Sequence, residues 1–332
     1  MLPQMDHLIT LLNNSQNVLV ATHAVPDGDA IGSLIAMSLV LIGRQKQVTL
    51  YNESPIPAVY RFLPLVHHVT AHLASADIYD TAVILDCGDL QRIGDAASLV
   101  SRIPEIINID HHITNTRFGT CQLIDVQACA CTEILWRLFK KMGVEFTRDI
   151  ATCIYTGILT DTGSFRFSNT SQTTFEICEN MVACGVDPYQ VAQSVYGTYS
   201  LGRIKLLNLA LDSIEISENG KVSLMTMTCE MLAETGTQPE DADGLINYAR
   251  RIQDVKMAVM IQEQLNGCAG RKNGYGQRHP YHISLRSDGS VDVAAIAASF
   301  GGGGHRSAAG FSLESTLPEI KERILRIAES VA

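Results

Sequence analysis

The chain has little positive charge and no long apolar run. Its 332 residues include 25 Lys and Arg against 35 Asp and Glu, which gives a formal net charge of −10 at pH 7. Long duplex nucleic acid is bound largely through Lys and Arg that neutralise phosphates, so it is not an expected partner. The most apolar stretch, residues 31–42, is interrupted by Gly32, Ser33 and Ser38. This interruption favours a buried helix over a membrane span, and no membrane partner is expected.

A secretion signal and a paired cysteine framework are also missing. The first residues, MLPQMDHLIT, have neither the basic head nor the long apolar core of a signal peptide. The nine cysteines are odd in number, and Cys129 and Cys131 do not have C-x-x-C spacing. These features favour reduced thiols and a cytoplasmic location.

What is present is the pattern of an α/β protein. With 46% hydrophobic and 18% charged residues, the chain can bury the cores of two globular domains. In its first half, short β-branched runs alternate with helical patterns, which predicts a parallel sheet with helices on both faces. The expected strands are 17–22, 47–51, 81–85 and 105–109. The expected helices are 30–43, 129–141, 147–160 and 175–182.

The pattern changes near residue 212. Two short runs, 213–217 and 221–226, flank Glu218-Asn-Gly220 and predict a hairpin; strands at 255–263 and 281–286 and a helix at 318–328 follow. We therefore predict a first domain over 1–190, a helical connector over 191–211 and a smaller α/β domain over 212–332. The Gly-rich, basic segment 267–279 is predicted to be a loop.

Carboxylates and imidazoles follow three of the predicted strands in the first half. Because the carboxyl ends of parallel strands meet at one edge of a sheet, these groups are expected to lie close together. One such residue alone has a simpler interpretation: Asp29 could cap a helix, and Asp86 could be an ordinary turn carboxylate. Several ionisable groups at strand ends are costly to bury unless they bind something. The residues are His23, Asp27, Asp29, Asp86, Asp89, Asp110, His111 and His112, with Asp161 at the end of a predicted helix.

Carboxylate oxygens mixed with imidazole suit Mn²⁺, and also Mg²⁺, Fe or Zn²⁺. The candidates exceed what one ion needs, and none of them is a cysteine. A pair of divalent cations about 3.5–4 Å apart would use them all.

These segments resemble a known family. The motifs are H-x-x-P-D-x-D-A-x-G-S at 23–33, D-x-x-D at 86–89, D-H-H at 110–112 and D-T-G-x-F-R at 161–166. They resemble the DHH phosphoesterases. In the second half, G-G-G-H at 302–305 with Ala308-Ala-Gly310 resembles the domain that accompanies DHH. The resemblance is closest to the nanoRNase and pAp-phosphatase group, with RecJ exonucleases and DHH-type pyrophosphatases more distant.

The resemblance implies a role for each position. His23 and Asp27 would hold one cation, Asp29, His111 and Asp161 the other, and Asp86 would bridge them. Asp110 would orient its neighbours. His112 would face the substrate phosphate, either stabilising its charge or protonating the leaving oxygen. Asp89 would tune the bridge or end the turn, and the second role is favoured.

Substrate contacts are expected from glycines and arginines. A glycine run is often only a flexible turn, but followed by a histidine and matching the family motif it is expected to bind substrate. A guanidinium binds phosphate in a bidentate fork, although a surface arginine is the simpler interpretation. The candidates are Arg166, Arg286, Gly302, Gly303, Gly304 and His305, with Asn247, Arg250 and Arg251 evenly balanced.

The resemblance implies hydrolysis of phosphate esters by hydroxide activated between two cations, with Mn²⁺ the first choice. The expected substrates are very short oligoribonucleotides, cut to mononucleotides, and 3′-phosphoadenosine 5′-phosphate. A phosphodiesterase of cyclic dinucleotides or their linear products, a pyrophosphatase and a non-catalytic nucleotide sensor are the alternatives. A homodimer is left open.

Overall fold

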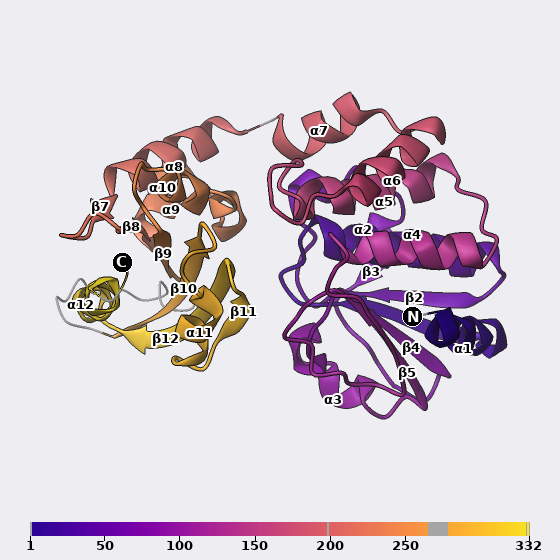
Figure 1. The fold of residues 1–332 in the computed structure, drawn as a ribbon. Helices are drawn as coiled ribbons and strands as arrows, with labels where there is room; N and C mark the ends of the chain where they lie inside the picture. The colour runs from indigo at the N-terminus through magenta and orange to yellow at the C-terminus, as the bar shows by residue number, and fades with distance from the viewer. Residues whose placement is uncertain (1, 198, 265–277, 330, 332) are drawn as a thin grey trace. The chain divides into compact units, whose positions relative to one another are not determined.

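The computed structural model describes residues 2–197, 199–264, 278–329 and 331. The chain divides into two compact units, residues 1–198 and 199–332 (Figure 1). Of the segment predicted as a loop, residues 267–277 lie outside the described part, and His279 begins a strand.

The first unit is built on a parallel sheet of six strands in the order β3-β2-β1-β4-β5-β6. The order reverses between β1 and β4, which is where α/β sheets open a crevice beyond the carboxyl ends of their strands. The predicted α/β class with a parallel sheet is confirmed. The strands are β1 (Asn17–Thr22), β2 (Gln47–Tyr51), β3 (Val69–Thr70), β4 (Thr81–Leu85), β5 (Glu105–Asp110) and β6 (Cys121–Ile124).

Both faces of this sheet are covered, which explains its continuous apolar strands. In β1, Val18 and Val20 join the core on one face, and Leu19 and Ala21 join the core on the other. Helices α2, α4, α5 and α6 lie over the first face and α3 over the second (Figure 1). The helices of this unit are α1 (Leu2–Asn14), α2 (Gly28–Gly43), α3 (Ala97–Val100), α4 (Cys131–Lys141), α5 (Arg148–Asp161), α6 (Gln172–Ala183) and α7 (Pro188–Tyr196), with short 3-10 helices η1 (Ala58–Tyr60), η2 (Val66–His68) and η3 (Leu90–Ile93).

Helix α2 begins two residues earlier than predicted because its cap is Asp27, not Asp29. The Asp27 carboxylate accepts hydrogen bonds from the backbone N–H groups of Asp29 and Ala30, both at 3.0 Å. Helix α4 begins two residues later than predicted, because Ala130 is still extended and acts as its N-cap residue.

Helices α2 and α5 pack closely because glycine lies at their contacts. A Cβ atom on Gly28 would lie 2.4 Å from the Thr160 hydroxyl, and one on Gly32 would lie 2.5 Å from the Cys153 carbonyl oxygen. This packing brings the end of α5, with Asp161, next to the start of α2.

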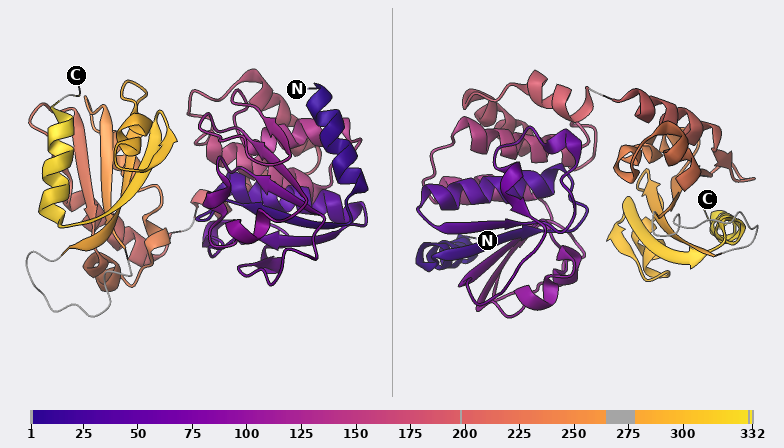
Figure 2. Two further views of the ribbon diagram at one scale, coloured as in Figure 1. Left: turned by 90° about the horizontal axis from the view of Figure 1, so that it is seen from below. Right: turned by 180° about the vertical axis from the view of Figure 1, so that it is seen from behind.

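The second unit contains a mixed sheet in the order β11-β12-β10-β9-β8-β7, in which only β8 and β9 are parallel. Helices lie on both faces of this sheet (Figure 2). Apolar side chains of α11 and α12 form the core on one face, and those of α8, α9 and α10 form the core on the other. The predicted hairpin is confirmed as β7–β8, with Gly220 at φ 71° in its turn. The elements are α8 (Leu201–Asp212), β7 (Glu215–Ile216), β8 (Val222–Met227), α9 (Cys229–Thr235), η4 (Pro239–Ala242), α10 (Ile246–Arg250), β9 (Met257–Glu263), β10 (His279–Ser287), α11 (Val293–Ala298), β11 (Gly303–His305), β12 (Ala308–Ser315) and α12 (Leu317–Ala328).

The stretch predicted as a connector contains the end of α7, at Tyr196, and most of α8, which begins at Leu201. The two compact units divide between these helices. The prediction of reduced thiols is wrong at Cys229, which is disulfide-bonded. The described free cysteines are Cys87, Cys121, Cys129, Cys131, Cys153, Cys178 and Cys184.

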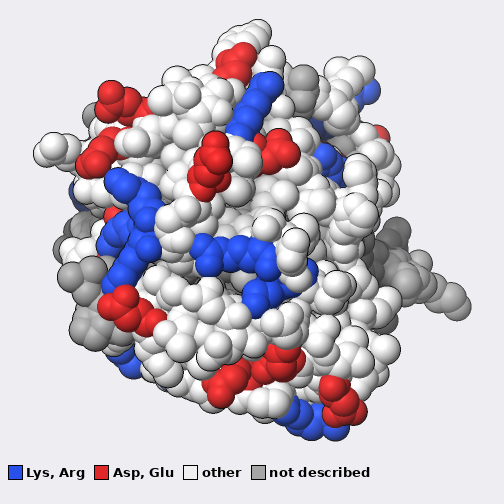
Figure 3. Space-filling model, turned by 90° about the vertical axis from the view of Figure 1, so that its right-hand side faces the viewer, with Lys and Arg blue, Asp and Glu red and all other residues white. Residues whose placement is uncertain are grey.

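No helix within the described ranges is long and apolar enough to cross a membrane. On the face of the molecule drawn in Figure 3, a band of Lys and Arg side chains has Asp and Glu side chains around it. This face is therefore of mixed charge and does not form a uniformly basic surface.

Candidate metal centre

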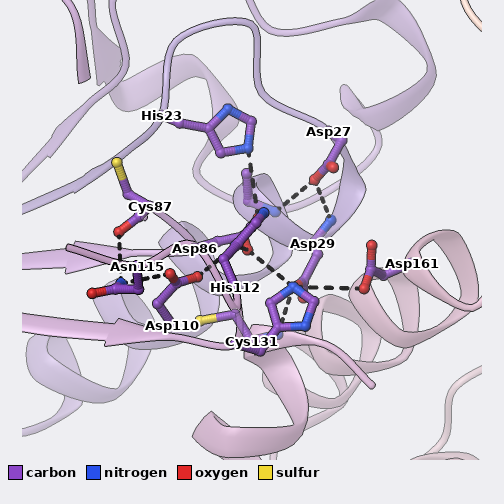
Figure 4. A network of polar contacts seen from close by, with 12 residues as sticks. His23, Asp27, Asp29, Asp86, Cys87, Asp110, His112, Asn115, Cys131 and Asp161 are labelled. Atoms are coloured by element: carbon purple, nitrogen blue, oxygen red, sulfur yellow. Dashed lines mark hydrogen bonds and ion pairs between the residues drawn. The ribbon is translucent and has the colours of Figure 1, made fainter. Parts of the chain in front are cut away.

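Three strand ends and one helix end in the first unit bring carboxylates and imidazoles together (Figure 4). His23 follows β1, Asp86 follows β4, Asp110 ends β5 and Asp161 ends α5. Each side chain is thus placed by an element whose core packing fixes its end. Asp27, Asp29, His111 and His112 complete the set.

The ligand atoms form three overlapping groups, and Asp86 belongs to two of them, one of which it shares with His111 and His112. Those of His23, Asp27 and Asp86 lie within 4.8 Å of one another, and so do those of Asp29, His111 and Asp161. His23 Nε2 lies 3.6 Å from Asp86 Oδ2, and His111 Nε2 lies 3.5 Å from Asp86 Oδ1. One Asp86 oxygen therefore faces His23, and the other faces His111.

Asp86 combines an unusual backbone conformation with a buried side chain. Its φ of 50° is rare for a residue other than glycine, and its side chain is 2% exposed. Its Oδ1 atom is buried and has no hydrogen-bond partner within the described ranges, although His111 Nε2 and His112 Nδ1 each lie 3.5 Å from it. An unsatisfied buried carboxylate oxygen is costly, and a cation would satisfy it. The residues present therefore fit divalent metal.

The two ligand histidines are oriented by main-chain carbonyls. His23 Nδ1 bonds to the Ala24 carbonyl oxygen at 2.8 Å, and His111 Nδ1 to that of Ala128 at 3.3 Å. A carbonyl can only accept, so Nδ1 carries the proton in both rings and Nε2 presents its lone pair in the neutral form. This arrangement is typical of histidines that bind metal.

Without a cation, the groups of the cluster shift in different directions. Burial raises the pKa of Asp86, but its contacts with His111 and His23 lower that pKa well below its ordinary value overall. Burial and the charge of Asp86 raise the pKa of Asp29 to about 7. Burial also raises the pKa of Asp161 well above its ordinary value, although the charge of His111 opposes it. Burial lowers the pKa of His111, but its contacts with Asp86 and the neighbouring carboxylates raise that pKa well above normal overall. Bound cations would act in the opposite direction on Asp29, Asp161 and His111.

Asp29 is held by the start of α4. Its Oδ2 accepts from the Cys131 N–H at 2.5 Å, and its Oδ1 accepts from the Thr132 N–H at 3.0 Å and the Thr132 hydroxyl at 2.7 Å. Helix N-termini favour carboxylates in this position. Glycine at position 157 makes room, because a Cβ there would lie 2.5 Å from the Thr132 hydroxyl and 2.6 Å from Asp29 Oδ1.

His112 is oriented by a separate chain of hydrogen bonds (Figure 4). Its Nδ1 donates to Asp110 Oδ1 at 2.7 Å, and the Asn115 amide donates to Asp110 Oδ2 at 2.6 Å. Asn115 also donates to Asn108 Oδ1 at 2.9 Å, and Asn108 donates to the Cys87 carbonyl at 3.1 Å. The network thus connects the loop after Asp86 with His112.

Three of these residues were not part of the predicted site. Asn108 interrupts an otherwise apolar strand, which is a signal that sequence inspection could use. Asn115 follows the two histidines closely, but its partners are visible only in the fold. Thr132 has no sequence signal, because it meets Asp29 across more than a hundred residues.

The remaining predicted residues of the first unit, Asp89 and Arg166, follow Asp86 and Asp161 in the chain. Asp89 caps η3 by accepting from the Gln91 N–H at 2.8 Å, as an ordinary turn residue does. Arg166 is exposed, and its Nε donates to the Gly163 carbonyl at 2.5 Å. It follows a left-handed turn in which Gly163, Ser164 and Phe165 have φ of 57°, 61° and 62°.

The predicted substrate residues of the second unit share neighbouring strands. Arg286 on β10 and His305 on β11 both pair with Ala308 of β12, so they lie on one face of the sheet with a small residue between them. The glycines preceding His305 differ in their roles. Gly302 and Gly304 are required for packing, because Cβ atoms there would lie 2.2 Å from the Gly310 oxygen and 2.5 Å from the Ala308 oxygen. Gly303 faces open space.

Comparison with known proteins agrees with this geometry. Residues 17–158 match the DHH family, N-terminal domain, and residues 221–332 match the DHHA1 domain. The bifunctional oligoribonuclease and PAP phosphatase NrnA of Thermus thermophilus is 30% identical over 318 residues, covering 93% of this chain and 88% of that protein.

Two solved structures share the fold. The crystal structure of an exopolyphosphatase-related protein from Bacteroides fragilis has a TM-score of 0.88 at 25% identity, covering 100% of this chain and 98% of that one. RecJ of Thermus thermophilus in complex with Mn²⁺ has a TM-score of 0.58 at 12% identity, covering 99% of this chain and 55% of RecJ. The likeness to RecJ concerns the fold alone.

The parallel sheet with a cluster of carboxylates and imidazoles at its strand ends lies in the region that matches the DHH family, and the class of protein is therefore a phosphoester hydrolase. The chain belongs to the DHH family of phosphoesterases, and its second unit contains the DHHA1 domain.

Proposed function

We propose that this protein hydrolyses very short oligoribonucleotides to mononucleotides, and 3′-phosphoadenosine 5′-phosphate to AMP, with two divalent cations, Mn²⁺ ahead of Mg²⁺. The observation that carries the proposal is Asp86, whose two oxygens face two separate groups of ligand atoms. The similarity to a protein named for both activities, over 93% of this chain, supports the choice of substrates.

Under this proposal, two sets of residues would each hold one cation. His23 and Asp27 would hold one cation and Asp29, His111 and Asp161 the other, with Asp86 between them. Two bound cations supply hydroxide at neutral pH and neutralise the phosphate under attack. The chain contributes the geometry: the main-chain carbonyls orient the histidines, and α4 orients Asp29.

His112 would either protonate the leaving oxygen or stabilise the charge on the phosphate. Its Nδ1 donates to Asp110, which orients the ring, and its Nε2 would contact a substrate oxygen. Burial raises the pKa of the Asp110 carboxyl, but the hydrogen bond from His112 and its charge lower it overall. An ionised Asp110 holds the His112 ring in one orientation, in which the imidazole would stabilise phosphate charge or protonate the leaving oxygen.

Substrate-binding residues are proposed in each unit. The first domain, 1–190, would carry the chemistry, with Arg166 contacting phosphate. The second, 212–332, would bind the rest of the nucleotide through Arg286, His305 and the exposed backbone at Gly303. The net charge of −10 supports small anionic substrates over long duplexes, because cations at one site can attract a phosphate locally.

The test is a substrate panel with Mn²⁺. Dinucleotides, longer RNA, 3′-phosphoadenosine 5′-phosphate, pyrophosphate and cyclic dinucleotides are incubated separately with the protein, and the products are separated by chromatography. We expect mononucleotides from dinucleotides and AMP from the bisphosphate, with slower turnover of longer RNA. Preferred turnover of pyrophosphate or of cyclic dinucleotides would replace this proposal with another, and binding without any product would indicate a sensor.

A further inference from the structure

Segment 128–132, which leads from β6 into α4, holds two of the three residues proposed for one cation. The Ala128 carbonyl oxygen lies 3.3 Å from His111 Nδ1, and backbone N–H groups at the start of α4 donate to Asp29 at 2.5 and 3.0 Å. The five residues of this segment are buried, with at most 4% of any of them exposed. A displacement of the segment would therefore move both Asp29 and His111.

The third residue, Asp161, is joined to this segment by Asn169. The Asn169 amide nitrogen donates to the Cys129 carbonyl oxygen at 2.9 Å and to the Asp161 carbonyl oxygen at 3.2 Å. A side-chain amide has two N–H groups, so each carbonyl can accept one of them. Because carbonyl oxygens only accept, the nitrogen of the amide and not its oxygen faces them. One side chain thus connects the end of α5 with segment 128–132.

The chain after α5 turns back and brings Asn169 into this place. The last carbonyls of a helix have no partner within it, and Asp161 is the last residue of α5. Gly163, Ser164 and Phe165 follow it at φ of 57°, 61° and 62°, which is costly for the two residues that are not glycine. A fold retains such a turn where other contacts fix it. The two hydrogen bonds of Asn169 are contacts of this kind.

The Cys129 peptide is fixed on its other side by Glu133. Glu133 Oε2 accepts from the Cys129 N–H at 2.8 Å, and Glu133 Oε1 accepts from Arg137. Arg137 also donates to Asp125 at 2.6 Å. The Glu133 side chain is 5% exposed, and removing one partner of a buried ion pair strongly destabilises a protein. Asn169 is therefore the contact of this segment that can be removed without breaking an ion pair.

His23 and Asp27, which are proposed for the other cation, are held by their own neighbours in the chain. His23 Nδ1 bonds to the carbonyl oxygen of Ala24, the next residue, at 2.8 Å. The Asp27 carboxylate accepts from two N–H groups in the first turn of α2, both at 3.0 Å. The positions of these two ligands are therefore set by the end of β1 and the start of α2.

We propose that Asn169 is a positioning residue for the cation that Asp29, His111 and Asp161 would hold. It fixes the distance between the end of α5 and the segment that holds Asp29 and His111. The inference rests on the proposed function in dividing the ligands between two cations. It adds the residue that assembles one of the two sites, and it predicts that this site can be weakened without the other.

The experiment measures Mn²⁺ affinity at each site separately. Metal-free, full-length protein is titrated calorimetrically with Mn²⁺ in two variants that each lack one ligand. His23→Ala retains the site that Asn169 would position, and Asp161→Asn retains the other. Asn169→Ala is then added to each variant. In His23→Ala we expect it to weaken Mn²⁺ binding roughly 10- to 100-fold, as the loss of a group that orients metal ligands does. In Asp161→Asn it should change the affinity by less than about twofold, because independent sites do not couple.

Asn180→Ala is the matched control. It removes an exposed asparagine of α6 whose amide also donates to a main-chain carbonyl, and it should leave Mn²⁺ affinity unchanged in both variants. Thermal unfolding in excess chelator shows that each variant is folded.

Three results would overturn the inference. Equal weakening by Asn169→Ala in both variants would show that Asn169 only stabilises the fold. Unchanged affinity in His23→Ala would show that its contacts do not position the ligands, and a native protein that binds no Mn²⁺ would leave nothing to position. The proposed function fails separately, if the substrate panel yields no product while Mn²⁺ still binds.

Discussion

Asp86 is the residue on which both proposed cation sites depend. Its backbone is in the left-handed region and one of its buried oxygens has no hydrogen-bond partner among the described residues, and a fold retains such features where a ligand satisfies them. We predict that Asp86→Asn lowers turnover of a dinucleotide with Mn²⁺ by about a hundred- to a thousandfold, the usual loss when a group that stabilises transition-state charge is removed. Calorimetric titration should also show weaker Mn²⁺ binding. Asp89→Asn is the matched control, because Asp89 only caps η3, and it should stay within a few fold of the native protein.

Asn115 is a positioning residue for His112. Its amide holds Asp110, which in turn holds the imidazole. We predict that Asn115→Ala lowers kcat roughly 10- to 100-fold, the usual loss when a supporting hydrogen bond is removed, with little change in KM. A 4-nitrophenyl ester of a nucleotide should be less affected than a dinucleotide, because its leaving group needs no proton.

The control for Asn115 is Asn180→Ala, at an exposed position on α6, which should have native kinetics. Equal losses with both substrates would show that Asn115 does not act through leaving-group protonation by His112. The role of His112 would then be to stabilise the charge on the phosphate.

Among individual residues, the charged side chains of the site could be predicted from the sequence. The polar side chains that orient them could not. The carboxylates and imidazoles could be found because an ionisable group at the end of a buried apolar strand is costly unless it binds something. Thr132 and Asn115 are ordinary polar residues in the sequence. Their value comes from contacts with Asp29 and Asp110, which the tertiary fold creates.

Among the elements, α2 and α5 together place the cluster. Their glycine contacts let the helices approach, and Gly157 lies against both Asp29 and Thr132. We predict that Gly157→Ala destabilises the protein by about 1–3 kcal/mol, as overpacking does, and weakens Mn²⁺ binding because Asp29 must move. Gly43→Ala, on the same pair of helices but with open space around it, should be neutral or slightly stabilising. Denaturant unfolding and calorimetric metal titration measure both effects. Unchanged metal affinity in Gly157→Ala would show that the α5 contact does not position Asp29.

Strands that are buried on both faces could be predicted closely, since their apolar runs are continuous. The predicted 17–22, 47–51 and 81–85 coincide with β1, β2 and β4. Strand β12 was not predicted, because its sequence begins Ala308-Ala-Gly310 and lacks β-branched residues. Its pairing with β10 and β11 stabilises it in place of intrinsic propensity. The first residues of α2 and α4 were predicted incorrectly, because the sequence does not show which residue acts as the N-cap.

For the whole molecule, stability is expected to depend jointly on pH and metal. In metal-free protein, burial and the charge of Asp86 raise the pKa of Asp29 from 3.8 to about 7, and the pKa of Asp161 is raised too. The folded state therefore binds more protons than the unfolded state above pH 3.8, and stability is lost as pH rises towards about 7. The raised pKa of His111 acts in the same direction, since its contribution is present at low pH and lost as pH rises.

Cations that bind only the folded protein should reverse this trend, because they replace the protons. We therefore predict that the melting temperature of metal-free protein, measured in excess chelator, falls as pH rises from about 5 to 7. Saturating Mn²⁺ should raise the melting temperature more at pH 7 than at pH 5. Asp161→Asn removes one carboxylate from the cluster. In excess chelator, its melting temperature should depend less on pH than that of the native protein, and added Mn²⁺ should raise its melting temperature less. A melting temperature in chelator that rises over this pH range, or a Mn²⁺ response that is equal at both ends, would show that these carboxylates do not form one coupled site. Differential scanning calorimetry at matched ionic strength decides between the two outcomes.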